Sequence, residues 1–232
     1  MSDEMMNLAH IGAGLATLCL YWALLLRRKG DGRHRKWGRW FLYSWGATLA
    51  SVALVTIGRS GQFEPPEVIQ FVYLSLCVIV VGATVVLSRR WKGDLPRFRG
   101  AWFRIGATVI FGLGALVLVA GLVNADILPV AFSSVGLIYG GAMLRFAFLR
   151  QEVHPNWALI WHLNGVIFLF NAIHGTLLAV LLRAWIWPEA GDGLNVATHF
   201  ATLAVCLWMR LWYGQRYAAP LRLAAGRVAV VT

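Results

Sequence analysis

Residues 102–123 read WFRIGATVIFGLGALVLVAGLV, a stretch in which Arg104 is the only charged side chain. An α-helix rises 1.5 Å per residue, so about 20 mostly apolar residues are needed to cross some 30 Å of hydrocarbon. This stretch is long enough and apolar enough to do so. It predicts a transmembrane helix, and the same pattern recurs along the whole chain.

Six further segments meet the same criterion. The seven expected spans are 5–26, 40–58, 67–88, 102–123, 127–149, 157–182 and 194–213. The connections between them are short, and several hold the Gly, Pro, Asn and Asp residues that end helices and turn the chain. The sequence therefore predicts an all-α fold, a polytopic membrane bundle of seven transmembrane helices that forms one domain over residues 1–232.

Composition agrees with a membrane protein. Hydrophobic residues make up 59% of the chain, and its 24 glycines raise the apolar share to about 69%, against roughly 45–50% in a soluble domain. Lysine and arginine exceed aspartate and glutamate by 11. In so apolar a chain, this excess favours asymmetric membrane loops and argues against a nucleic-acid partner.

The basic residues predict the orientation, because 19 of the 21 fall on one side of the expected spans. The segments that hold them are 27–39, 89–104, 145–150 and 210–227. The opposite side holds only Arg59 and Arg183, together with seven of the ten acids. Cytoplasmic loops carry the excess of Lys and Arg, so we expect the N-terminus outside and the C-terminus in the cytoplasm.

Histidines are the ionisable side chains of interest inside the spans, because no Asp, Glu or Lys falls in the middle of one. His10 and His199 lie about five residues, or ~8 Å, below the outer ends of their spans, and His174 lies at a similar or slightly greater depth. Each lies on a helix stripe of small or polar residues, which is typical of a face turned into a bundle. His162 lies about 120° from His174 around its helix, so it is not expected in the same site.

Neutral imidazole is a ligand for haem iron and for transition metals. Two facing histidines suffice for a haem b, and three suit zinc or copper. We therefore expect His10, His174 and His199 to bind a haem b or, at the same site, a transition metal. No motif for nucleophilic or acid–base catalysis is present, so no catalytic residue is predicted.

Two functions remain open on these observations. The leading hypothesis is an integral membrane protein with a redox or electron-transfer role at the outer-side histidine site. The alternative is a non-catalytic subunit or assembly factor that packs against partner membrane proteins, with histidines that only hydrogen-bond neighbouring helices. A visible spectrum of the purified protein discriminates between the two.

The basic loops also predict contacts with lipid. Tryptophans cluster at the ends of the spans, where an indole prefers the headgroup region, and neighbouring Lys and Arg meet anionic headgroups there. The residues expected to contact headgroups are Lys29, His34, Arg35, Arg89 and Arg90.

Two short patterns concern packing. Gly136-x-x-x-Gly140, followed by Gly141, is typical of a face on which two helices approach closely. Lys-Gly-Asp occurs at 29–31 and again at 92–94, an offset of 63 residues. This repeat indicates either a duplicated two-helix unit or two similar basic turns.

Two motifs lie near the start of the chain: His10-x-x-x-Gly14 and Lys29-Gly30-x-x-x-His34-Arg35-x-x-Gly38. They resemble the pattern of an uncharacterised family of predicted multi-pass bacterial inner-membrane proteins, and the resemblance covers the first 60 residues best. It implies a multi-pass location in the bacterial inner membrane. It implies no reaction.

The orientation can be tested with reporter fusions. A reporter fused after Thr232 should be active only as a cytoplasmic reporter, and one fused at Met1 only as a periplasmic reporter, because of the 19-to-2 division of basic residues. The opposite pair of activities would reverse every assignment of an inner or outer end.

Overall fold

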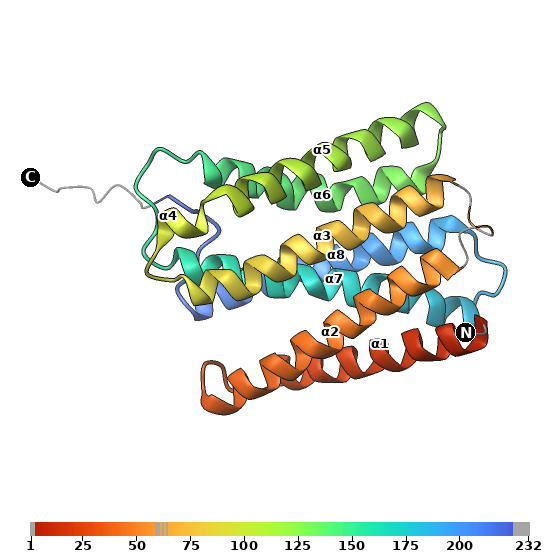
Figure 1. Ribbon diagram of the computed structural model, residues 1–232, viewed down its shortest axis with the longest axis horizontal. Coiled ribbons are helices and arrows are strands. Elements are labelled where there is room, and N and C mark those ends of the chain that lie inside the picture. Colours follow the sequence, from red (N-terminus) through yellow and green to blue (C-terminus); the bar gives the residue numbers. More distant parts are fainter. Residues whose placement is uncertain (1–2, 59–60, 62, 64, 225–232) are drawn as a thin grey trace, which may run out of the picture. The chain divides into compact units, whose positions relative to one another are not determined.

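The computed structural model describes residues 3–58, 61, 63 and 65–224. Over these residues it contains eight helices and one isolated β-bridge, between Val153 and Ala224. The helices are α1 (Asp3–Leu26), α2 (Gly32–Gly58), α3 (Pro65–Arg90), α4 (Leu95–Phe98), α5 (Ala101–Val123), α6 (Ile127–Ala147), α7 (Trp157–Trp185) and α8 (Asp192–Arg216) (Figure 1). All except α4 are long and apolar enough to cross a membrane, which confirms the all-α polytopic bundle of seven spans.

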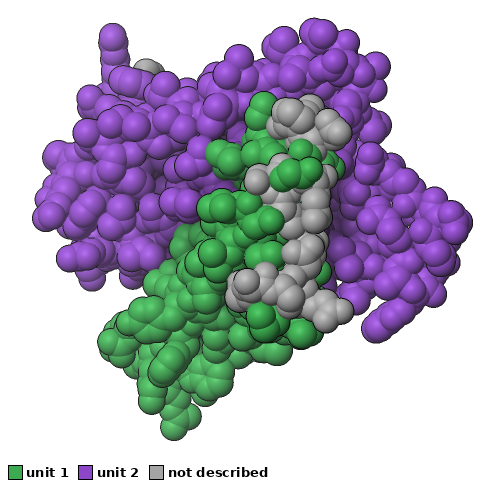
Figure 2. Space-filling model, turned by 45° about the vertical axis from the view of Figure 1, so that its right-hand side comes forward, with its two compact units in different colours: residues 1–72 green, residues 73–232 purple. Residues whose placement is uncertain are grey.

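The chain divides into two compact units (Figure 2). The boundary between them lies inside α3. Unit 1 covers residues 1–72 and contains the α1–α2 hairpin, and unit 2 covers residues 73–232 and contains the rest of α3 with α4 to α8. The single domain over 1–232 and the orientation of the termini both stay predictions. Several residues used in the charge and topology arguments lie outside the described residues: Met1, Arg59, Glu64, Arg227 and Thr232.

The largest difference from the expected spans is at the start of α2. α2 begins at Gly32 instead of residue 40, because the Asp31 carboxylate caps its first turn by accepting from the His34 backbone N–H at 2.6 Å. The basic residues that follow continue the helix outside the apolar segment. α4 was not expected at all, since a helix of four residues leaves no periodic pattern in the sequence.

The repeated Lys-Gly-Asp has a local explanation in capping. Asp94 accepts from the Arg97 backbone N–H at 3.0 Å, just as Asp31 accepts from His34. The elements that follow are unlike, since Asp31 starts the long α2 and Asp94 starts the short α4. The backbone differs as well, because Gly30 has a positive φ of 84° and Gly93 does not. The repeated aspartate therefore caps a helix N-terminus in both places, and the duplicated two-helix unit stays a prediction.

Hydroxyl groups join α1 to α2 within unit 1. The Thr17 hydroxyl is 2.8 Å from that of Ser44 and 2.9 Å from that of Thr48, and it lies 2.9 Å from the Ala13 carbonyl. Thr17 donates to this carbonyl, and Thr48 donates its own proton to the Ser44 carbonyl at 3.0 Å, so the Ser44 hydroxyl is the one left to donate to the Thr17 oxygen. Such bonds hold helices together where lipid surrounds them.

Glycine lets α5 and α6 approach closely in unit 2. A Cβ on Gly114 would lie 3.1 Å from the Leu137 nitrogen, and one on Gly140 would lie 2.9 Å from the Phe111 nitrogen. A Cβ on Gly136 would overlap the Ile110 carbonyl oxygen. The prediction that Gly136 and Gly140 form a close-packing face is confirmed.

Tyr73 inserts its hydroxyl into the hydrogen-bond ladder of α6. The Gly136 N–H donates to the Tyr73 oxygen at 2.8 Å, and the Tyr73 hydroxyl donates toward the carbonyls of Phe132 at 3.2 Å and Ser133 at 3.1 Å. The side chain is 1% exposed. This contact fixes α3 to the middle of the α5–α6 hairpin.

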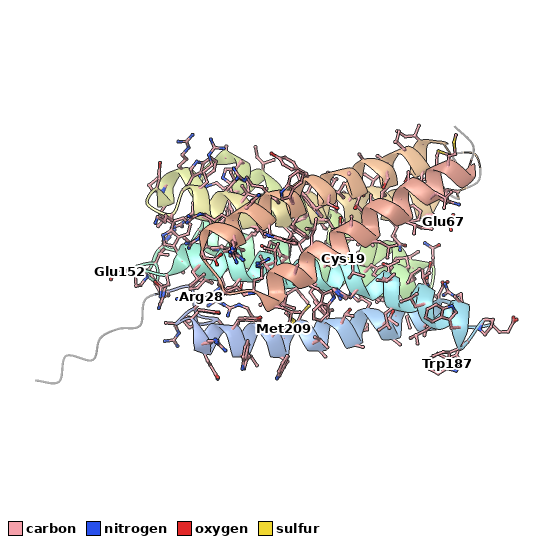
Figure 3. All side chains as sticks on the ribbon, turned by 90° about the horizontal axis from the view of Figure 1, so that it is seen from below. Cys19, Arg28, Glu67, Glu152, Trp187 and Met209 are labelled. Carbon is pink, nitrogen blue, oxygen red and sulfur yellow. The ribbon has the colours of Figure 1, made fainter. Side chains whose placement is uncertain are left out.

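The connections of unit 2 lie at two opposite ends (Figure 1). One end holds α4, the α6–α7 connection and the segment after α8, and the other holds the α5–α6 turn and the α7–α8 connection. Glu152 and Trp187 mark these two ends in Figure 3. The basic residues of 89–104 fall at the first end, which is the end expected to face the cytoplasm.

The glycine contact between α5 and α6 can be tested by adding one methyl group. Gly136→Ala should lower the stability of the detergent-purified protein by about 1–3 kcal/mol, because the new Cβ meets backbone that must shift. Gly112→Ala is the matched control, since its Cβ has open space around it on α5. Thermal unfolding measures both, and equal midpoints would contradict the close approach.

Candidate functional site: the α7–α8 hairpin

His174 is held in one orientation by its own helix. Its Nδ1–H donates to the Phe170 carbonyl at 2.9 Å, four residues earlier on α7. The imidazole also stacks on the Phe170 ring, with centroids 3.9 Å apart and an interplanar angle of 15°. Because a carbonyl only accepts, the proton lies on Nδ1 and Nε2 is the acceptor nitrogen. That is the tautomer of a histidine that ligates through Nε2.

His199 uses its ring differently. Its Nε2 lies 3.1 Å from the Ser134 hydroxyl of α6, and its ring contacts those of Phe132 and Phe200 at centroid distances of 5.1 and 5.4 Å. The residue is 3% exposed. The Nε2 of His199 is therefore engaged by a neighbouring helix.

An asparagine joins the two helices between these histidines. The Asn171 amide donates to the Thr202 hydroxyl at 2.6 Å and to the His199 carbonyl at 3.0 Å. A Cβ on Gly175 would lie 3.3 Å from the same hydroxyl and 3.8 Å from the His199 Cα. Gly175, which follows His174 in the chain, thus packs against His199. The two histidines therefore lie at similar heights along the α7–α8 hairpin.

His10 lies in unit 1 and contacts α2. Its Nδ1 is 2.9 Å from the Ser51 hydroxyl, which in turn donates to the Thr48 carbonyl at 2.7 Å. The single hydroxyl proton is used in the second bond, so the His10 Nδ1–H donates and Nε2 is again the acceptor. His10 and His174 share this tautomer, each within its own unit.

His162 shows the same arrangement at the other half of α7. Its Nδ1–H donates to the Val85 carbonyl of α3 at 3.0 Å. His162 and Asn164 are two residues apart on one helix and therefore point in nearly opposite directions. Accordingly, α7 presents His162 to α3 and Asn164 to α8.

The described part of neither unit forms a metal site of three protein ligands. Among the residues that the structure describes, no three His, Cys, Asp or Glu side chains are grouped so as to hold a metal ion. A haem needs only one or two histidines from the protein, so this observation weighs against zinc or copper more than against haem.

Arg210 is a buried cation that the sequence analysis missed. It lies on α8 six residues, or ~9 Å, before the helix ends at Arg216, and it is 6% exposed. Its Nε donates to Asn164 Oδ1 at 2.5 Å. Its charge and position in the sequence group it with the basic residues expected in the cytoplasm. Its spacing of four from Cys206, which extends the inward stripe of His199 and Thr202, could have identified it.

Two further hydrogen bonds of Arg210 hold the segment that follows α8. Nη1 donates to the Ala219 carbonyl at 2.8 Å and Nη2 to the Pro220 carbonyl at 3.0 Å. A Cβ on Gly214 would lie 2.6 Å from Nη1 and 2.9 Å from the Ala219 carbonyl oxygen, so this position needs a glycine. The segment then continues to the α6–α7 connection, where the His154 N–H donates to the Leu223 carbonyl at 2.9 Å.

The expected headgroup residues fall into two groups. Arg35, Arg89 and Arg90 are exposed. Lys29 is half-buried, and its ammonium donates to the carbonyls of Leu24 and Leu25, both at 2.6 Å, at the end of α1. Burial lowers the pKa of Lys29 to about 8, so the amine is still mainly protonated at neutral pH and can donate. These two bonds cap the C-terminal end of α1.

His34 is the remaining member of that set and is half-buried at the start of α2. Its backbone N–H is the group that Asp31 caps. The Lys-Gly-x-x-x-His motif therefore builds the turn between α1 and α2: Lys29 ends one helix, Gly30 supplies the positive φ, and His34 lies in the first turn of the next.

Comparisons of the chain with known protein families, curated proteins and solved structures found no match.

The Arg210 contacts can be tested through the segment that they hold. Arg210→Gln should expose Ala219, which is fully buried, because two of the arginine's bonds end on the carbonyls of Ala219 and Pro220. In the Ala219→Cys background, the new thiol should react at least several-fold faster with a membrane-impermeant maleimide once Arg210 is replaced. Arg216→Gln, which removes an exposed arginine from the same helix, serves as the control. Unchanged labelling in the Arg210 variant would contradict the clamp.

Proposed function

We propose that this integral membrane protein binds a b-type haem through His174 and serves electron transfer or a related redox task. The observation that carries the proposal is the His174 hydrogen bond to the Phe170 carbonyl, together with the stacked Phe170 ring. Histidines that ligate metals nearly always donate their other ring N–H to a carbonyl, a carboxylate or water. His174 has this arrangement before any ligand is bound.

The other two expected ligands, His10 and His199, differ in which ring nitrogen is hydrogen-bonded. His10 carries the same tautomer in unit 1. His199 would have to give up its Ser134 bond to ligate through Nε2, so we assign it the role of a polar neighbour that fixes α8 against α6. A transition metal bound by His10, His174 and His199 is the less favoured form of the same proposal.

The location follows from the sequence. Seven helices that can span a membrane make the chain a multi-pass membrane protein. We propose the bacterial inner membrane, on the basis of the family resemblance in the first 60 residues, and an outside N-terminus, on the basis of the basic residues.

The haem proposal is tested by absorbance and elemental analysis of the detergent-purified full chain. We expect a Soret band, reducible visible bands and stoichiometric iron. His174→Ala should lower bound haem by roughly 10-fold or more, because even the loss of a group that only orients a ligand costs 10–100-fold. His10→Ala is measured in the same way.

His162→Ala is the matched control, because this histidine has the same hydrogen-bond pattern at the other half of the same helix. It should retain its haem, and we expect His199→Ala to retain more than His174→Ala. Full haem retention in His174→Ala would overturn the assignment.

A second function is favoured by a different observation. The polar side chains within the spans of unit 2 bind one another across helices, as in the pairs Asn171–Thr202, Ser134–His199 and Asn164–Arg210. This is the pattern of a non-catalytic membrane subunit or assembly factor whose polar groups serve packing. Absence of haem and stoichiometric metal, with histidine variants that lose only about 1 kcal/mol of stability each, would select this function.

A further inference from the structure

The turn between α3 and α5, which contains α4, packs firmly against neighbouring helices of unit 2. Phe98 of α4 is fully buried, and its ring contacts the rings of Trp102, Phe103, Phe146, Trp157 and Trp161 at centroid distances of 4.9–6.5 Å. The next residue, Arg99, donates through Nη2 to the carbonyls of Ala147 and Leu149 at 2.7 and 2.9 Å. These contacts fix the backbone of the turn against α5, α6 and α7.

The outer surface of this turn carries an arginine on a tryptophan. The Arg97 guanidinium lies 4.8 Å from the centroid of the Trp91 ring, and Trp91 meets Trp102 edge-on at 6.1 Å. Arg97 is exposed. Stacking uses the face of a guanidinium and leaves the N–H groups on its edge to bind an anion in a bidentate manner.

The charge around Arg97 is strongly positive. Arg89, Arg90 and Lys92, which precede it at the end of α3 and in the following turn, are exposed. Asp94 is the only acid between residues 89 and 104, and it accepts the Arg97 backbone N–H as the cap of α4. The surface is therefore complementary to an anionic group.

An exposed apolar side chain lies next to this charged surface. Ile105 is 62% exposed and lies one turn beyond Trp102 on the same face of α5. The indoles of Trp91 and Trp102 occupy the junction between the cations and this apolar face, where tryptophan is found at membrane interfaces. A soluble anion would use only the cations, whereas a phospholipid would use both parts.

We propose that Arg97, Trp91, Trp102 and Ile105 bind one anionic phospholipid, with its phosphate on the edge of Arg97 and an acyl chain along Ile105. Arg89, Arg90 and Lys92 supply the supporting positive charge, and Trp91 holds the Arg97 guanidinium in place. The site extends the headgroup contacts expected for Arg89 and Arg90 to a defined phosphate ligand, and it is independent of any haem.

The test is native mass spectrometry of the detergent-purified full chain, titrated with phosphatidylglycerol and, separately, with phosphatidylcholine. The wild type should bind one phosphatidylglycerol in preference to phosphatidylcholine, and Arg97→Gln should reduce that preference about 5-fold. Arg104→Gln is the matched control, because it removes one exposed charge from the same end of α5, where Arg104 lies over Phe148 at 5.7 Å.

Three results would overturn the proposal. An unchanged preference in Arg97→Gln would remove Arg97 as the phosphate ligand. Equal losses in Arg97→Gln and Arg104→Gln would show that only total charge matters. Displacement of the lipid by inorganic phosphate in tenfold excess would identify a site for free anions. Thermal unfolding of each variant without added lipid checks that the exposed substitution leaves the fold intact.

Discussion

The structure depends on one constraint: a polar group surrounded by hydrocarbon needs a partner within the protein. Helices satisfy the backbone, and the side chains are satisfied between helices. Unit 1 meets this demand with the hydroxyls around Thr17. Unit 2 meets it with longer-range pairs, such as Asn171 with Thr202 and Tyr73 with the backbone of α6. The apolar faces that remain are turned outward, which suits a chain surrounded by lipid.

This constraint also explains how arginine is used. Arg99 donates to backbone carbonyls at the end of α6, and Arg210 does the same beyond α8, with Asn164 as its third acceptor. A helix C-terminus offers carbonyls without partners and a negative dipole end, both of which favour a cation. Asp31 and Asp94 in turn cap helix N-termini. Some charged residues on the basic side of the chain therefore bind the backbone at helix ends. Other basic residues there, such as Arg89 and Arg90, stay exposed at the surface.

Much of the fold could be predicted from the sequence because a membrane span is a long and nearly uniform signal. The seven spans were predicted to within a few residues except at the start of α2, where Arg33 to Arg39 continue the helix beyond the apolar part. The close-packing role of Gly136 was also evident, since its spacing from Gly140 is a property of the helix alone. α4 was missed because Phe98 is buried by contacts with residues far along the chain.

The candidate site could be predicted only in part. Helical spacing places His174 and His199 on inward faces, but it does not reveal which ring nitrogen each uses, because Phe170 belongs to the same helix and Ser134 to another. Arg210 shows the opposite difficulty, since its charge drew it into the cytoplasmic count although its spacing matched the inward stripe. For the histidines the missing information was the hydrogen-bond partner of each ring nitrogen, whereas for Arg210 the spacing already indicated an inward position.

The Arg210 bonds have a consequence for how the protein is made. Two of the acceptors that stabilise this buried guanidinium, the carbonyls of Ala219 and Pro220, follow it in the chain by nine and ten residues. During synthesis α8 emerges before these acceptors do. α8 therefore gains its full set of Arg210 bonds only after the segment through Pro220 has also left the ribosome, so the packing of this helix depends on residues that follow it.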